Sequence, residues 1–247
     1  MLRNYCESAQ INEVYLSASE HGDMSGLDHL AAVVEQLHRS NIRVEALLSS
    51  ENADEPGKHR DKLLERVHQI AQFNMRHSTA KFDGIHLDIE PQQRPENKGP
   101  ANLGFLPGLV DAYRAVRAVA EPEGLSVNAD IQNKLLKGNV AQRRMLMSSL
   151  RRLTLMLYEL SSPNDGDGIE TQKQKLRAAS QKYLQMAYEG LSGNDLATMI
   201  VALRTPDYGD RLPEMLKALD EVNGGNSHYQ GWGHHAFSDV LAQSSAH

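Results

Sequence analysis

Short apolar stretches alternate along the chain with longer segments in which apolar residues recur every three to four positions. The short stretches are typical of buried strands, and the longer segments are typical of amphipathic helices. Seven strands are predicted: Glu13–Ser19, Ile42–Ser49, Phe82–Glu90, Leu125–Ile131, Leu153–Glu159, Thr198–Thr205 and Tyr229–Phe237. A helical pattern separates each strand from the next, least clearly at about Val140–Leu150. This alternation predicts an α/β fold with a parallel sheet and right-handed crossovers.

A TIM (β/α)8-type barrel is the fold class that this pattern favours. A barrel of this type has eight strands, whereas the pattern predicts seven. Residues 1–10 have the pattern of the end of a helix, so we expect a barrel that lacks its first strand or is truncated there; an open seven-stranded sheet is the alternative. A length of 247 residues without an internal repeat fits one such domain, which we assign to residues 1–241, with 242–247 as a flexible tail.

The third predicted strand carries an unusual polar face. In the sequence FDGIHLDIEP, two sets of side chains alternate: Ile85, Leu87 and Ile89 on one face, and His86, Asp88 and Glu90 on the other. A parallel strand covered on both faces is normally almost wholly apolar. Because a buried unpaired charge is costly, the three ionisable groups need a partner, a metal or a catalytic role.

Composition excludes several classes of function. The net charge of −6 and the lack of any run of Lys or Arg argue against a nucleic acid as the main partner. No apolar run is long enough for a membrane span, and the first residues lack the features of a signal peptide. Cys6 is the single cysteine, so no disulfide framework is expected and the cellular location stays open.

Two carboxyl groups on one strand face could perform acid–base chemistry. Asp88 and Glu90 are separated by about 6–7 Å along the backbone. A second negative charge nearby raises the pKa of a carboxyl, which suits a general acid near neutrality. A salt-bridged pair at a strand end is the structural alternative. Further polar side chains are expected at the same cleft: Asn128 and Asp130, where Asp130 pairs with His86 or contacts a ligand, together with Glu45 and one of His234 and His235.

These motifs resemble the signature of family 18 glycoside hydrolases, the chitinases and their relatives. That family carries DxxDxDxE at the end of its fourth barrel strand, and this chain has Asp83, His86, Asp88 and Glu90 at the four acidic positions. Two strands later the family carries M-x-Y-[DN], where this chain reads Met156-Leu157-Tyr158-Glu159. Its last strand carries a tryptophan, here Trp232. The segments FDGIHLDIEP and GWGHHAF also resemble a set of bacterial βα-barrel proteins related to glycosidases.

The resemblance implies a division of roles. Glu90 would protonate the leaving glycosidic oxygen, while the acetamido carbonyl of the substrate would act as nucleophile. Asp88 would orient that acetamido group and Tyr158 would donate a hydrogen bond to its carbonyl oxygen. Trp232 would form an apolar floor under a sugar. His86, Asn128, Asp130, Glu45 and His234 would complete the substrate-binding set, with no cofactor. The implied substrate is an oligo- or polysaccharide with N-acetylated sugars, such as chitin or peptidoglycan.

One departure from the family pattern leaves two other functions open. His86 stands where the family has an acidic residue, and an imidazolium there would hold Asp88 less free to turn. The chain could therefore be a carbohydrate-binding barrel without turnover. Alternatively, His86, Asp88 and Asp130, with Glu90 and one of the C-terminal histidines, could hold a divalent metal in a hydrolase, although no HxH or HExxH motif is present.

Overall fold

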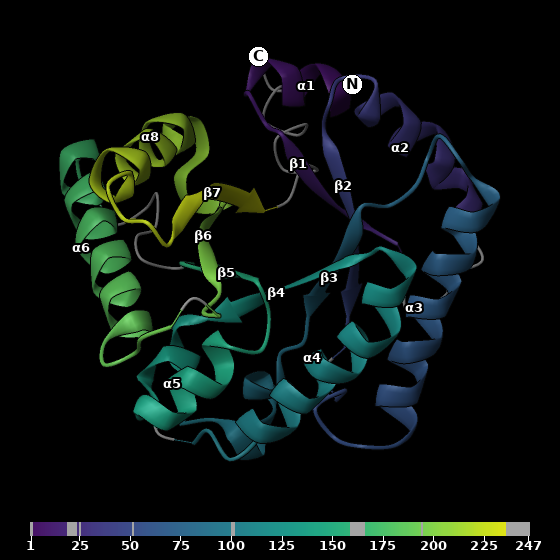
Figure 1. Ribbon diagram of the computed structural model, residues 1–247. Helices are drawn as coiled ribbons and strands as arrows, with labels where there is room; N and C mark the ends of the chain where they lie inside the picture. The colour runs from purple at the N-terminus through teal and green to yellow at the C-terminus, as the bar shows by residue number, and fades with distance from the viewer. Residues whose placement is uncertain are drawn as a thin grey trace. The chain divides into compact units, whose positions relative to one another are not determined.

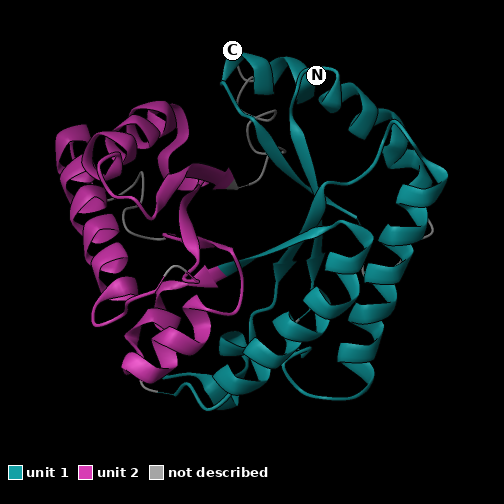
Figure 2. Cartoon of the chain, in the orientation of Figure 1, with its two compact units in different colours: residues 1–130 teal, residues 131–247 magenta. Residues whose placement is uncertain are grey.

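The computed structural model describes residues 2–18, 24, 26–50, 52–99, 102–158, 166–193 and 195–235. It contains two compact units, residues 1–130 and 131–247, which Figure 2 shows in teal and magenta. We describe each unit by itself. Ser25, Glu159, most of the loop 160–168 and the tail 242–247 lie outside the described residues.

Unit 1 is built on parallel strands that follow one another in chain order. Its strands are β1 (Glu13–Ser17), β2 (Arg43–Ser49), β3 (Gly84–Asp88) and β4 (Ser126–Gln132), which begins in this unit. The α-helices are α1 (Leu2–Ser8), α2 (Ala31–His38), α3 (Lys58–Arg76) and α4 (Leu106–Ala120). The 3-10 helices are η1 (Leu27–Leu30), η2 (Pro91–Gln93), η3 (Pro95–Asn97) and η4 (Glu121–Glu123). Figure 1 shows α2, α3 and α4 along one side of the strands.

The two faces of the unit 1 sheet differ in chemistry. One face holds fully buried aliphatic side chains, among them Val44, Leu48, Ile85 and Leu87, and packs against the apolar faces of the helices. The register aligns Tyr15 with Glu45, Leu47 with His86 and His86 with Asn128. Side chains at aligned positions share a face, so the polar groups of four strands gather on the other side. The predicted separation of aliphatic from ionisable residues is thus confirmed.

Unit 2 continues the same alternation. Its strands β5 (Arg152–Met156), β6 (Thr198–Arg204) and β7 (Tyr229–His235) are parallel and again pair in chain order. Its helices are η5 (Asn133–Lys137), α5 (Val140–Met147), α6 (Ile169–Tyr188), α7 (Thr205–Tyr208), η6 (Gly209–Arg211) and α8 (Leu212–Asn223). Asn139 and Gln142 form a capping box that starts α5, the helix with the least clear pattern in the sequence.

All seven predicted strands are present, and the fold is that of a βα barrel with one strand fewer than eight among the described residues. A doubly wound sheet reverses its strand order at a switch point, whereas each strand within units 1 and 2 pairs with its neighbour in the sequence. Among the described helices, none combines the length and the apolar character that a membrane span requires.

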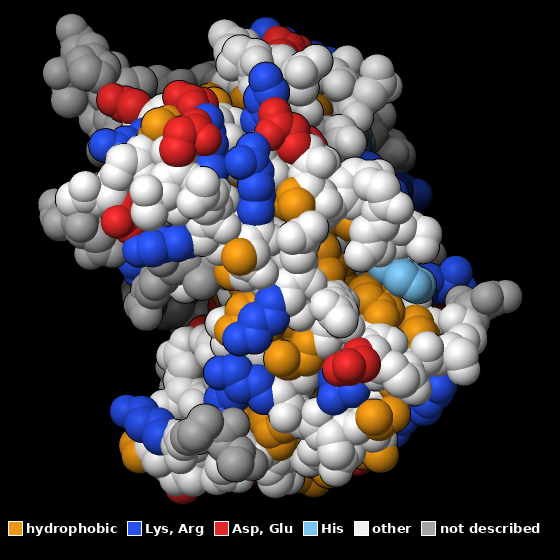
Figure 3. Space-filling model, turned by 90° about the vertical axis from the view of Figure 1, so that its left-hand side faces the viewer, with side chains coloured by type: hydrophobic (Ala, Val, Ile, Leu, Met, Phe, Trp, Pro, Cys, Tyr) orange, Lys and Arg blue, Asp and Glu red, His pale blue; other side chains and the backbone are white. Residues whose placement is uncertain are grey.

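Charges of both signs are interspersed on the surface of unit 2. Lys173 of α6 lies 2.9 Å from Glu170 and 2.8 Å from Glu214 of α8, and Arg177 lies 2.6 Å from Glu221. The face seen in Figure 3 shows acidic and basic side chains next to one another in the same way. Acidic and basic side chains are thus mixed on this face of unit 2.

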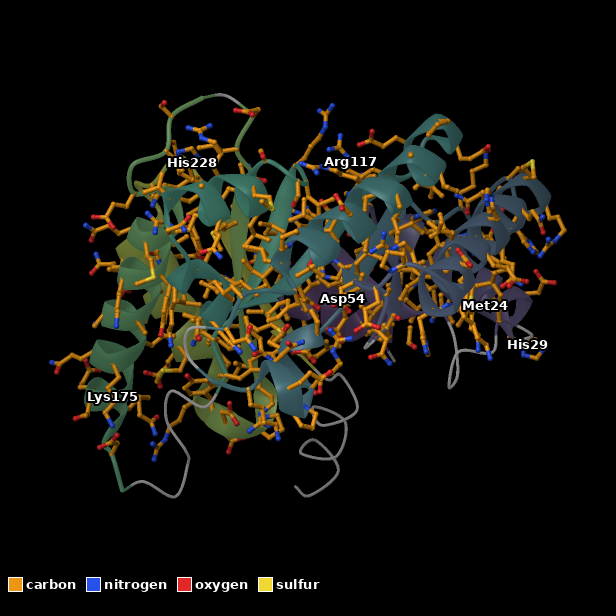
Figure 4. The ribbon with its side chains drawn as sticks, turned by 90° about the horizontal axis from the view of Figure 1, so that it is seen from below. Met24, His29, Asp54, Arg117, Lys175 and His228 are labelled. Atoms are coloured by element: carbon orange, nitrogen blue, oxygen red, sulfur yellow. The ribbon has the colours of Figure 1, made fainter. Side chains whose placement is uncertain are left out.

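The segment after β2 packs tightly on the first turn of α4. A Cβ atom built on Gly108 would lie 2.4 Å from the backbone oxygen of Asp54, the residue labelled in Figure 4. Arg60 joins the two segments, since its Nη2 donates to the backbone oxygens of Asp54 at 2.5 Å and of Gly108 at 3.1 Å. The glycine therefore permits a close approach of two backbones.

Gly108→Ala is expected to destabilise unit 1 by about 1–3 kcal/mol, the usual cost of overpacking. The sign is informative, because alanine in a helix interior is ordinarily favoured over glycine by about 1 kcal/mol. Urea denaturation followed by circular dichroism measures the change. Gly168→Ala is the matched control, since a Cβ there meets no atom within 4 Å. Equal stability of the Gly108→Ala variant and the wild type would contradict the close approach.

Candidate functional site

The carboxyl ends of β3 and β4 carry the acidic residues of the candidate site. Strand β3 ends at Asp88, and Glu90 leads into η2 because Pro91 cannot continue the ladder. Glu90 is half-buried and accepts hydrogen bonds from its own segment: Nε2 of Gln92 lies 3.2 Å from Oε1, and Gln93 donates to Oε2. The loop itself thus orients the carboxylate of Glu90.

A salt-bridge cluster holds this loop in place. Arg94 lies 2.6 Å from Asp54 and 2.8 Å from Glu55, both in the segment after β2, and 3.3 Å from Glu96 in its own segment. Both the guanidinium and the Asp54 carboxylate are largely buried, where charged hydrogen bonds are stronger than at the surface. The loop that carries Glu90 is therefore tied to the neighbouring loop.

His86 lies between two carboxylates beneath the strand ends. Its Nδ1 is 3.4 Å from Oε2 of Glu45 and its Nε2 is 3.0 Å from Oδ1 of Asp130. The contact to Asp130 is a close ion pair. The Tyr15 ring stacks on the imidazole, with centroids 3.6 Å apart and planes 16° apart. Asp130 thus pairs with His86, which is one of the two alternatives that the sequence left open for it.

Glu45 is the most enclosed carboxylate of the site, with no exposed surface. Its Oε1 accepts from Nδ2 of Asn128 at 2.7 Å and from Oγ of Ser126 at 3.2 Å, and lies 3.5 Å from the Arg43 guanidinium. The side chains of Glu45, Asn128 and His86 are thus engaged with one another and almost without surface. Contact of these three side chains with a substrate stays a prediction.

Burial and neighbouring charges shift the pKa values of Asp88 and His86. Burial raises the pKa of Asp88 to about 7, reinforced by the negative charges of Asp130 and Glu90 and opposed by His86 and a hydrogen bond from Ser49. Burial alone would lower the pKa of His86, but the Asp130 and Glu45 carboxylates raise it to about 9. Near neutral pH, His86 therefore carries a positive charge, while Asp88 exchanges a proton readily.

Two tyrosines, Tyr15 and Tyr113, lie within reach of the charges of these groups. Tyr15 covers the imidazole of His86. Tyr113 of α4 is fully buried, and its hydroxyl lacks a hydrogen-bond partner among the described residues. Burial raises the pKa of Tyr113, and the charges of Asp130, Asp88 and Glu90 raise it further. Tyr113 occupies an apolar position of a periodic helix, so the pattern marked it as core; Tyr15 shares a predicted strand face with serines, which was its only signal.

The other predicted site residues lie in unit 2. Tyr158 follows β5 and is half-buried; its role stays a prediction. Nε1 of Trp232 donates to Oδ2 of Asp220 in α8 at 3.0 Å. Trp232 aligns with buried Val201 of β6, which places the indole on the helix-facing side of β7. Its role under a sugar stays a prediction. His234 aligns with Leu203 on that same side, and its Nδ1 lies 3.3 Å from Oγ1 of Thr205.

The first acidic position of the motif has a structural role. Asp83 precedes β3, at the end of the strand opposite to Asp88. Its Oδ2 accepts from the backbone N–H of Val44 at 2.8 Å and lies 3.1 Å from Nε2 of His38. Asp83 therefore joins β3 to β2 and α2.

The donor set does not fit the metal-dependent alternative. No group of three or more His, Cys, Asp or Glu side chains with suitable geometry for a metal occurs among the residues that the structure describes. Both ring nitrogens of His86 already face carboxylates, so neither presents a lone pair to a cation.

Comparisons with known proteins confirm the fold. The chain matches no protein-family profile and no curated protein sequence. Among solved structures, it is similar to the glycoside hydrolase domain of PgaB (BpsB) from Bordetella bronchiseptica, with 14% identity, a TM-score of 0.51, and coverage of 97% of this chain and 83% of that one. It is also similar to the spore cortex-lytic enzyme SleL of Bacillus megaterium, with 13% identity, a TM-score of 0.50, and coverage of 83% and 46%.

A third similar structure is catalytic domain 2 of the group II chitinase of Ostrinia furnacalis, with 14% identity, a TM-score of 0.46, and coverage of 78% of this chain and 56% of that one. The chain thus spans about half the length of the chitinase and SleL structures. The PgaB and SleL likenesses agree with the barrel that the sequence pattern predicts.

Proposed function

We propose that the chain is a glycoside hydrolase that acts on an oligo- or polysaccharide containing N-acetylated sugars, chitin- or peptidoglycan-like, with Glu90 as the proton donor. The observation that carries the proposal is the cluster of Asp88, Glu90 and Asp130 at adjacent strand ends, above a buried imidazole. The carboxyl ends of the strands are where the active sites of βα barrels lie. The solved structures of similar fold include a glycoside hydrolase domain and a spore cortex-lytic enzyme.

The proposed reaction is cleavage of a glycosidic C–O bond by water. Glu90 gives its proton to the leaving glycosidic oxygen as that bond breaks, and the proton of the incoming water restores the carboxyl group. The acetamido carbonyl of the substrate attacks the anomeric carbon first, and water then opens the cyclic intermediate. Asp88, which exchanges its proton near neutral pH, lies beside Glu90 and is proposed to orient the acetamido group.

Release of reducing ends from a panel of soluble glycans tests this function. We expect release from N-acetylglucosamine oligomers or peptidoglycan fragments, none from unsubstituted glucose oligomers, and no effect of a chelator. Binding of the N-acetylated oligomers without release after long incubation would instead identify a carbohydrate-binding barrel. Loss of activity on chelation would favour the metal-dependent alternative.

A further inference from the structure

A chain of charged groups runs from the interior of unit 1 to the acidic strand ends. It begins at Glu45, passes through His86 and ends at Asp130, whose side chain is 16% exposed. Glu45 and His86 have none. The inner end is thus sealed, and Asp130 is the member that solvent or a ligand can reach.

The geometry determines the charge on His86. A neutral imidazole has one N–H donor and one lone pair, so one of its nitrogens would direct a lone pair at a carboxylate. Nδ1 lies 3.4 Å from a Glu45 oxygen and Nε2 lies 3.0 Å from an Asp130 oxygen, so a doubly protonated ring, with its positive charge between the two carboxylates, suits both partners. The stacked ring of Tyr15 adds a favourable contact for a cation.

Asp130 is thereby placed next to Asp88. The parallel register pairs His86 with Asn128 and Leu87 with Ala129, so the next residues on the two strands are Asp88 and Asp130. Oδ1 of Asp88 is buried and has no hydrogen-bond partner among the described residues. The two carboxyl groups face a common space in which one negative charge disfavours the other.

We propose that His86 is a positioning residue which, braced by Glu45, holds the Asp130 carboxylate in place beside Asp88, so that Asp130 of the neighbouring strand β4 supplies a negative charge next to Asp88. The consequence for catalysis rests on the proposed glycosidase function: with its pKa raised to about 7, Asp88 can exchange a proton beside the substrate near neutral pH. The electrostatic arrangement itself does not depend on turnover.

The groups around this arrangement come from every element packed against it. They are Tyr15 of β1, Arg43 and Glu45 of β2, Asp88 and Glu90 at the end of β3, Asp130 of β4, and Tyr113 of α4. Arg43 lies at Glu45, on the far side of that carboxylate from Asp88. The charges that act most directly on Asp88 are therefore those of Asp130, Glu90 and His86.

A carbon-13 NMR titration of the Asp88 carboxyl group tests the proposal without any substrate. The resonance is assigned by its absence in Asp88→Asn. Asp130→Asn keeps the side-chain volume but removes the charge, so the Asp88 midpoint should fall by about one pH unit or more. Asp111→Asn, an exposed carboxylate of α4 paired with Arg114, is the control and should leave the midpoint unchanged.

His86→Gln should move the same midpoint in the opposite direction, because it removes the positive charge and keeps Asp130. Opposite displacements in the two variants support the proposal; an unchanged midpoint in Asp130→Asn, or displacements of the same sign, would overturn it. If His86→Gln does not fold, the Asp130→Asn result decides alone. Absence of glycosidase activity in the wild type would refute the proposed function and leave this titration result standing.

Discussion

Glu90→Gln is expected to lower kcat for glycan hydrolysis by about 10²- to 10⁴-fold, the range that general acid catalysis contributes. Glutamine keeps the shape of the side chain, and its amide oxygen can still accept from one of the two partners that orient Glu90, Gln92 or Gln93. Its NH2 group can donate to the other partner once that amide turns its oxygen toward it. It cannot give a proton to the leaving oxygen. Substrate affinity should therefore change little while turnover is lost, which initial rates and calorimetric binding measure together.

Glu96→Gln is the matched control for this variant. Glu96 lies in the same loop, is largely exposed and contacts Arg94 at the surface. Its replacement alters the loop charge equally but removes no predicted proton donor, so activity should remain near that of the wild type. Equal losses in both variants would mean that the charge of the loop matters and not the proton of Glu90.

His86→Leu is expected to reduce the free energy of unfolding by about 3–5 kcal/mol, because it removes the imidazolium beside the buried Glu45 carboxylate and leaves only the exposed Arg43 guanidinium, 3.5 Å away, as its counter-charge. The effect should depend on pH. The two carboxylates raise the pKa of His86 from 6.5 to about 9 in the folded state, so its stabilisation is fully present below pH 6.5 and disappears as the pH rises through 9. The pKa of Asp88 is also raised in the folded state. Asp88 therefore contributes a further fall in stability at lower pH, as the pH rises toward about 7.

Urea denaturation at several pH values measures this contribution. The wild type should lose stability between pH 7 and 9, and His86→Leu should lack that slope. His59→Gln, at an exposed position of α3, is the control and should change stability by less than about 0.5 kcal/mol. A His86→Leu variant as stable as the wild type at pH 6 would contradict the inference that His86 is charged between Glu45 and Asp130.

The sequence contained the strands and the polarity of their faces, because both depend on local periodicity. The period of two in residues 82–90 separated the aliphatic from the ionisable side chains, and Pro91 marked the end of the segment. Pairings between strands were less accessible. The contact of His86 with Asp130 could be suggested as an alternative, whereas its second contact, with Glu45, depends on the register of β2 against β3.

For the last strand, periodicity alone could not show on which face each side chain lies. The register between β6 and β7 shifts between Met199 and Val201, so the sequence alone does not tell which face Trp232 occupies. Its hydrogen bond to Asp220 shows that it faces α8. Tyr113 was missed for a related reason. Its ring is buried on the apolar face of a helix, while the charges of the acidic residues raise the pKa of its hydroxyl.

Hydrolysis of N-acetylglucosamine oligomers in oxygen-18 water, followed by mass spectrometry, tests the proposed function most directly. One heavy oxygen in each new reducing end reports cleavage of the glycosidic bond by water. We predict that the wild-type chain and Glu96→Gln release labelled products and that Glu90→Gln binds the same oligomers but releases almost none. Labelled products from Glu90→Gln at the wild-type rate, or none from the wild type, would contradict a glycosidase with Glu90 as its acid.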